Sequence, residues 1–212
     1  MIVTTLRKLA YLGCVLLLTP LFCSAGTILL TENFNELTPQ LGATSAGPFQ
    51  TIGGTNVDIV GGSLYGYLCV SPESGNCIDM DGTGGNPQGV LQSVSAITLL
   101  PGQTYFLSFD LIGSQRGNTT STTVTFGSYD QTFVLASGDD TSGIVTNAAI
   151  NVGSPTSAFL TFTSNTPGQQ GALLDDVTVT AGATTPEPQT WTLLLLGTLL
   201  LLKWSRPKFS VG

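Results

Sequence analysis

Short apolar runs separated by turn residues fill the chain between positions 26 and 183. Leu107, Phe109 and Leu111 alternate with Ser108 and Asp110, which is the period of two expected of a half-buried strand. No stretch of this region keeps a helical period between capping residues. Many short alternating strands predict an all-β fold, namely an antiparallel β-sandwich of the jelly-roll type. The expected strands are 27–34, 57–60, 63–70, 90–100, 104–111, 122–128, 131–135, 144–152, 158–163 and 173–180.

The first 25 residues have the three parts of a secretory signal peptide. Arg7 and Lys8 precede an apolar run over 9–18, and small residues lead up to Ala25, after which we expect cleavage. A retained transmembrane anchor is the alternative, although the run falls short of the roughly 20 residues that a span needs and is interrupted at Pro20. The sequence therefore predicts a signal peptide helix at 1–25 and export from a bacterial cell.

Export changes the interpretation of Cys69 and Cys77, which lie downstream of the expected cleavage site. In an oxidising compartment such a pair is expected to form a disulfide that closes a small loop. Two buried free thiols are the alternative. Zinc is disfavoured because two cysteines in a chain without histidine cannot complete a tetrahedral shell.

The charges are distributed unevenly along the chain. All 13 acidic residues lie between Glu32 and Glu187, where Arg116 is the single basic residue, so this stretch has a net charge of −12. The other basic residues belong to the two ends. Nucleic acid is excluded as a partner because phosphate binding needs clustered lysine and arginine. The absence of histidine removes the commonest general base, and we predict a protein without catalytic activity.

The C-terminal end has three parts in a fixed order. Pro186, Glu187 and Pro188 are followed by an apolar helix expected at 190–202 and by a basic tail. This order resembles the PEP-CTERM sorting signal of Gram-negative bacteria. The resemblance implies that 184–212 is a sorting segment and that an exosortase-type membrane protease processes it. A plain single-pass anchor is the alternative, and both place the domain at 26–183 outside the inner membrane and the basic tail inside.

The region 76–180 resembles the galactose-binding-like jelly rolls of carbohydrate-binding modules. The similar segments are 77–86, 99–110 and 173–179, together with the early Glu32-Asn33-Phe34. In such modules a structural calcium ion often joins an early acidic residue to an aspartate of the last strand. The resemblance thus implies a calcium site at Glu32 and Asp176. The alternative is that Asp176 flanks a solvent-exposed edge strand. A turn with side-chain-to-backbone bonds is expected at Asp79 to Gly82, which lacks the spacing of an EF-hand.

Candidate sugar-binding side chains are few, because the region 26–183 has no tryptophan. Tyr65 and Tyr67 offer rings for stacking on a pyranose, and Arg116 offers a donor for sugar hydroxyls. Packing at a sheet edge is the alternative role for each tyrosine. The prediction is an exported cell-surface or exopolysaccharide-matrix protein with a structural or adhesive role. The alternative is a carbohydrate-binding module with a calcium-stabilised sugar site.

Overall fold

The computed structural model describes residues 26–69, 75–84, 88–139 and 144–182. The predicted signal peptide at 1–25 and the predicted sorting segment, with Pro186, Glu187 and Pro188, lie outside the described residues. Gly26–Thr184 forms a compact unit by itself. Within the described ranges, no helix is long and apolar enough to cross a membrane.

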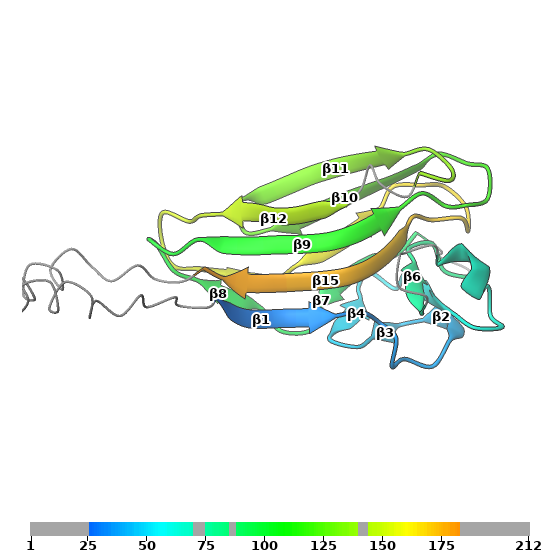
Figure 1. Cartoon of the computed structure of the whole chain (residues 1–212), viewed down its shortest axis with the longest axis horizontal. Coiled ribbons are helices and arrows are strands. Elements are labelled where there is room, and N and C mark those ends of the chain that lie inside the picture. Colours follow the sequence, from blue (N-terminus) through cyan, green and yellow to red (C-terminus); the bar gives the residue numbers. More distant parts are fainter. Residues whose placement is uncertain (1–25, 70–74, 85–87, 140–143, 183–212) are drawn as a thin grey trace, which may run out of the picture. The chain divides into compact units, whose positions relative to one another are not determined.

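The described residues form antiparallel sheets, which confirms the prediction of an all-β sandwich (Figure 1). One sheet has the order β12-β9-β15-β6-β5-β2, with β1 also paired to β15, and the other has the order β11-β10-β14-β7-β4-β3. A separate pair joins β13 to β8. The elements are β1 (Thr27–Glu32), β2 (Gln40–Ala43), β3 (Ser45–Ala46), β4 (Phe49–Thr51), β5 (Val57–Val60), the 3-10 helix η1 (Gly66–Leu68), β6 (Cys77–Asp79), β7 (Val90–Ser93), β8 (Ile97–Leu99), β9 (Tyr105–Ile112), β10 (Thr120–Phe126), β11 (Tyr129–Leu135), β12 (Val145–Ile150), β13 (Thr156–Ala158), β14 (Thr161–Ser164) and β15 (Leu173–Ala181).

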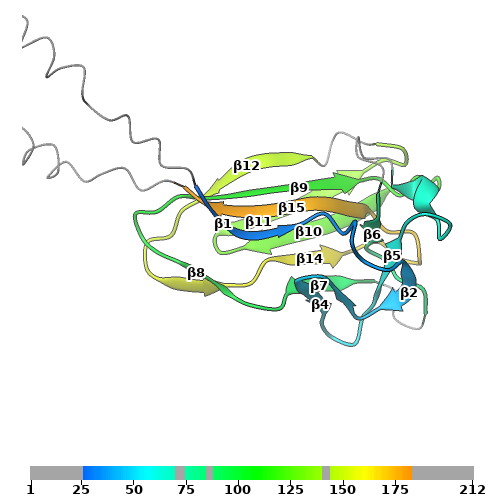
Figure 2. The ribbon, with the colours of Figure 1, turned by 60° about the horizontal axis from the view of Figure 1, so that its bottom comes forward.

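The main core is formed by buried residues from strands of both large sheets, whose strands are labelled in Figure 2. Phe109 of β9 meets Phe162 of β14, with ring centroids 5.3 Å apart and nearly perpendicular planes. Phe109 also meets Phe133 of β11, at 5.6 Å. Edge-to-face pairs of this kind add to the hydrophobic stabilisation of roughly 1.5–3 kcal/mol per buried large side chain. The alternation predicted for β9 is confirmed, since Leu107, Phe109 and Leu111 are all buried.

One predicted strand is wrong. No strand covers the described residues 63–69, which hold η1 between a tight turn and the disulfide. The backbone groups of Gly61 and Leu64 bond to each other in both directions at 2.9 Å, and Tyr65 follows with a left-handed φ of 56°. A chain that reverses so tightly cannot continue as an extended strand, although its apolar residues have the composition of one.

Two other predicted strands are each divided in the structure. The predicted strand 90–100 forms β7 and β8, which lie in different sheets, and 158–163 is divided between β13 and β14. Ser93 marks the first break, because its buried hydroxyl accepts the Leu160 N–H and donates to the Ser95 carbonyl. The short strands β2, β3, β4 and β6 were not predicted. They have two to four residues each, which is too short for a recognisable period.

Candidate functional site

The predicted disulfide between Cys69 and Cys77 is confirmed, with a Cα–Cα separation of 5.7 Å. Both half-cystines are buried in a second apolar cluster, separate from the main core. Its other members are Val60, Leu68, Ile112 and Leu173. The disulfide therefore fastens the segment that carries η1 to strands of the seven-stranded sheet.

Tyr65 and Tyr67 lie on this fastened segment and are both exposed. Tyr67 is 71% exposed and Tyr65 is 48% exposed. Their ring centroids are 6.3 Å apart, with an angle of 70° between the planes. Tyr65 has the left-handed backbone conformation that a non-glycine residue rarely adopts, and its carbonyl accepts the Leu68 N–H at 2.9 Å. A strained, fastened backbone that presents two large rings to solvent is typical of a recognition surface.

Arg116 is placed differently from the tyrosines. Its guanidinium donates to Asp79 Oδ2 in an ion pair, and the two side chains are 23% and 1% exposed. Asp79 Oδ1 accepts the Gly171 N–H at 2.9 Å and the Asp81 N–H at 3.1 Å. The second of these bonds confirms the predicted side-chain-to-backbone turn. The structure thus places Arg116 in an ion pair with the buried Asp79.

Asp79 and Asp81 are buried carboxyls with raised pKa values. Burial raises the pKa of Asp79 to about 7, and the positive charge of Arg116 offsets only part of that rise. Burial raises the pKa of Asp81 to about 6. Neither oxygen of Asp81 has a hydrogen bond of normal geometry, so the nearby Ser164 hydroxyl lowers this pKa only in part. Both carboxyls bind protons more tightly in the folded protein than in the unfolded chain.

This difference predicts a pH-dependent stability. Because both folded pKa values lie above the unfolded value, the stabilisation is complete below about pH 4 and is lost as the pH rises through 6 and 7. We expect the free energy of unfolding of residues 26–184 to fall by on the order of 2 kcal/mol between pH 5 and pH 8. Urea titrations across this range measure it.

Two substitutions distinguish the effect of the buried carboxyls on stability from the effect of exposed charges. Asp81→Asn should reduce the pH dependence below about pH 6, while Asp79 maintains it up to about pH 7, and Asn at the exposed Asp130 should leave its shape intact. Stability that is constant or rises toward pH 8 would show that the buried carboxyls do not govern it.

The residues predicted to bind calcium line a shallow pocket of about 370 Å³ beside β1 and β15. Thr31, Glu32 and Asn33 contribute from the β1 side, and Asp176 and Thr178 contribute from β15. Thr31 and Thr178 share a hydroxyl–hydroxyl bond at 3.3 Å. Asp176 has a left-handed φ of 49° in the bulge that interrupts the pairing of β15 with β9. Strand pairing thus brings both predicted ligands to one pocket.

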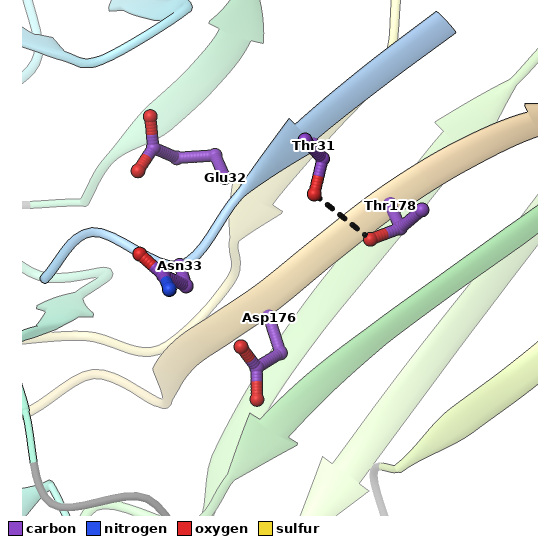
Figure 3. A pocket seen from close by; sticks show the side chains of 5 residues that line it. All are labelled: Thr31, Glu32, Asn33, Asp176 and Thr178. Carbon is purple, nitrogen blue, oxygen red and sulfur yellow. Dashed lines mark hydrogen bonds between the residues drawn. The ribbon is translucent and has the colours of Figure 1, made fainter. Parts of the chain in front are cut away.

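The two carboxylates do not converge within that pocket. Figure 3 shows the carboxylates of Glu32 and Asp176 pointing in different directions. Glu32 Oε1 accepts the Phe34 N–H at 2.7 Å. Burial, and after it the charge of Asp176, raises the pKa of Asp110. Asp110 is therefore a carboxyl that senses the charge of Asp176, and a cation beside Asp176 would relieve their repulsion. Among the described residues, no group of three or more acidic, Cys or His side chains is placed to hold a metal ion.

Comparisons with known proteins find similarity in structure only. No protein-family model matches the chain, and no curated protein is similar to it in sequence. The CBM22-1 xylan-binding domain of Paenibacillus barcinonensis Xyn10C is 13% identical, with a TM-score of 0.46 over 74% of this chain and 96% of that domain. The K1 cleaved adhesin domain of Lys-gingipain from Porphyromonas gingivalis W83 is 16% identical, with a TM-score of 0.41 over 73% of this chain and 98% of that domain.

A third similar structure is the Podospora anserina GH26-CBM35 β-(1,4)-mannanase. It is 14% identical, with a TM-score of 0.39, over 74% of this chain and 28% of that protein. At identities of 13–16% and TM-scores below 0.5, these likenesses carry no argument about the ligand. The ligand of this chain has to be argued from its own residues.

The buried carboxyls were not anticipated as a group. Asp58 accepts three bonds, from the N–H groups of Gly42 and Thr83 and from the Thr83 hydroxyl. It lies opposite Asp79 where β5 pairs with β6. In the sequence, only the spacing of Asp79 and Asp81 indicated that these carboxyls lie close together. The proximity of Asp58 results from the pairing of β5 with β6.

Proposed function

We propose that this chain is an exported, non-catalytic protein of the cell surface or extracellular matrix that adheres to polysaccharide through Tyr65 and Tyr67. The observation that carries the proposal is the pair of exposed rings on a segment fastened by the Cys69–Cys77 disulfide. A disulfide also suits an exported protein, because it persists in oxidising compartments.

The ring geometry favours a polymeric sugar. Aromatic rings bind pyranose faces by apolar contact, and a fastened loop loses little conformational entropy on binding. Since the planes of Tyr65 and Tyr67 differ by 70°, the rings suit two sugar units whose faces are turned relative to each other. The net charge of −12 between Glu32 and Glu187 repels anionic polymers. A neutral polysaccharide is therefore the proposed ligand.

A glycan array followed by calorimetry on residues 26–184 tests this function. We expect saturable binding to a neutral glycan, weakened about 30-fold by Tyr67→Ala, since a central tyrosine contributes roughly 2 kcal/mol to such contacts. Phe159→Ala removes another exposed ring, 43% exposed, and is the matched control that should bind as the parent does. Flat titrations across the array, or equal losses in both variants, would rule out the tyrosine site.

A calcium site at Asp176 is a second part of the proposal, supported by the pocket shared with Glu32 and by the proximity of Asp110. Oxygen ligands of this kind suit Ca²⁺. Calcium should raise the melting temperature of residues 26–184, and Asp176→Asn should abolish that rise. If calcium raises the melting temperature of Asp176→Asn as much as that of the parent, the ion does not bind at Asp176.

The C-terminal segment is proposed to direct sorting. The support is the order of Pro186-Glu187-Pro188, the apolar stretch 190–202 and the basic tail. An exosortase-type protease would process this segment at the inner membrane, and the domain would then reach the surface or matrix. Replacing all three motif residues by Ala should leave an unprocessed, membrane-bound form. If mass spectrometry of the wild-type chain shows an intact C-terminus at Gly212, the C-terminal segment is only a membrane anchor.

A further inference from the structure

The edges of the sheets are not equally protected against pairing with another chain. Edge strands present unpaired backbone groups, and proteins shield them with bulges or short strands. The edge strands β1, β2 and β12 each carry a register shift, between Ile28 and Leu30, between Gln40 and Ala43, and between Val145 and Ala148. Strands β3, β8 and β13 have three residues or fewer.

Strand β11 differs from these edges. It pairs with β10 in unbroken register over all seven residues, Tyr129–Leu135, and it ends the six-stranded sheet. It contains no Pro, Lys or Arg, and Asp130 is its single charged residue. Among the described edge strands, β11 is thus the long, regular one without a shielding device.

The hairpin between β10 and β11 determines which backbone groups face outward. Phe126 and Tyr129 close a two-residue turn and form a hydrogen-bonded pair, so alternate residues from Tyr129 onward bond to β10. The N–H and C=O groups of Asp130, Thr132 and Val134 therefore point away from β10. Of these groups, the Thr132 carbonyl accepts a bond from the Gln131 side chain, at 3.3 Å.

We propose that β11 pairs antiparallel with β11 of a second copy of this chain, about a two-fold axis at Thr132. This register is self-complementary. Thr132 meets Thr132 of the other copy, and Asp130 meets Val134, so the two Asp130 carboxylates do not face each other. The outward groups of the three residues then form six backbone hydrogen bonds, and the two six-stranded sheets become continuous.

The chemistry of the strand favours a copy of this chain as the occupant. The exposed side chains of β11 include Val134, which is 67% exposed. Pairing would cover this apolar side chain beside Asp130 of the second copy without bringing like charges together. Only three residues of each copy contribute the six backbone hydrogen bonds, so the contact is small and the dimer should be weak. Because both copies are acidic, their repulsion is screened by salt, and the dimer should tighten as ionic strength rises.

Sedimentation equilibrium on residues 26–184 tests the pairing. This unit has its own core and both large sheets, so it is a suitable protein for the measurement. We expect a monomer–dimer equilibrium that strengthens with salt. Val134→Asp faces Asp130 of the second copy and should weaken the dimer at least tenfold, whereas Val134→Lys should maintain or tighten it. Val94→Asp introduces the same charge at a residue that is 53% exposed and outside the strands, and should have no effect.

Cross-linking reports the register independently. A hydrogen-bonded antiparallel pair has Cα atoms about 5.5 Å apart, within reach of a disulfide. Thr132→Cys should therefore form a covalent dimer under mild oxidation, and Thr125→Cys, one strand further in, should not. A protein that stays monomeric at millimolar concentration, a dimer weakened by salt, or equal effects of Val134→Asp and Val94→Asp would overturn the proposal. A Val134→Lys variant that dissociates like Val134→Asp would overturn the register.

Discussion

Replacing Arg116 by Met should lower the free energy of unfolding by about 3 kcal/mol at pH 8, because it leaves a buried carboxylate unpaired. Asp79 is 1% exposed, and Arg116 is its partner in the ion pair. The two backbone N–H groups that also bond to Asp79 do not replace a positive charge. The loss of stability should be smaller at pH 5. Asp79 has a pKa of about 7, so at pH 5 it is protonated and leaves no unpaired charge. Urea unfolding at the two pH values measures the difference.

A second substitution separates the charge from the packing of the Arg116 side chain. The double variant Asp79→Asn/Arg116→Met has no unpaired buried carboxylate, so it should be more stable at pH 8 than Arg116→Met alone. The same loss at pH 5 and pH 8, with no recovery in the double variant, would mean that Arg116 stabilises the fold through contacts of its carbon chain alone.

Replacing both Cys69 and Cys77 by Ser should lower the free energy of unfolding by about 2.5 kcal/mol, from the loop-closure entropy of the short cross-linked segment. The residues lie eight positions apart, and both are packed with Val60, Leu68 and Leu173. The polar hydroxyls would also weaken this cluster. Because the cluster fastens the segment of Tyr65 and Tyr67, the variant should lose glycan affinity as well as stability.

Reduction supplies the control for this variant. The parent protein treated with a thiol reductant should unfold at lower urea, close to the Cys69→Ser/Cys77→Ser variant, whereas the variant itself should not respond to the reductant. An unchanged urea midpoint after confirmed reduction would contradict a stabilising role for the cross-link.

The sequence predicted those strands in which buried and exposed residues alternate along the strand itself. The strand β9 has a buried residue at every second position from Tyr105 to Leu111, and β10 alternates in the same way from Thr120 to Phe126. By contrast, the segment at η1 has the composition of a strand, but mutual backbone bonds between Gly61 and Leu64 reverse the chain. Turn geometry of this kind depends on the backbone and leaves no period in the sequence.

The candidate sites depended on contacts between distant segments. The pairing of Cys69 and Cys77 was predictable, because the residues are near in sequence and the predicted export would bring them to an oxidising compartment. The partner of Arg116 was not predictable, because Asp79 lies 37 residues earlier, on β6, whereas Arg116 lies in the loop between β9 and β10. Likewise, the resemblance to carbohydrate-binding modules implied one site for Glu32 and Asp176, but only the structure shows that the charge of Asp176 raises the pKa of Asp110.

The two proposals together describe how a weakly binding domain could adhere to a polymer. A dimer formed through β11 carries two tyrosine pairs. Two sites that bind one chain of polysaccharide raise the overall affinity without any new contact, provided that the polymer spans both. Adhesion would then depend on protein concentration at the surface as well as on the strength of each site.

Calorimetry of the Tyr65→Ala/Tyr67→Ala double variant, against the neutral glycan that the parent binds, tests the central claim most directly. Both rings are exposed, so their removal should leave the unfolding midpoint nearly unchanged. We predict that the double variant gives no measurable heat of binding while Phe159→Ala binds as the parent does. A folded double variant that retains the parent's affinity would contradict the account.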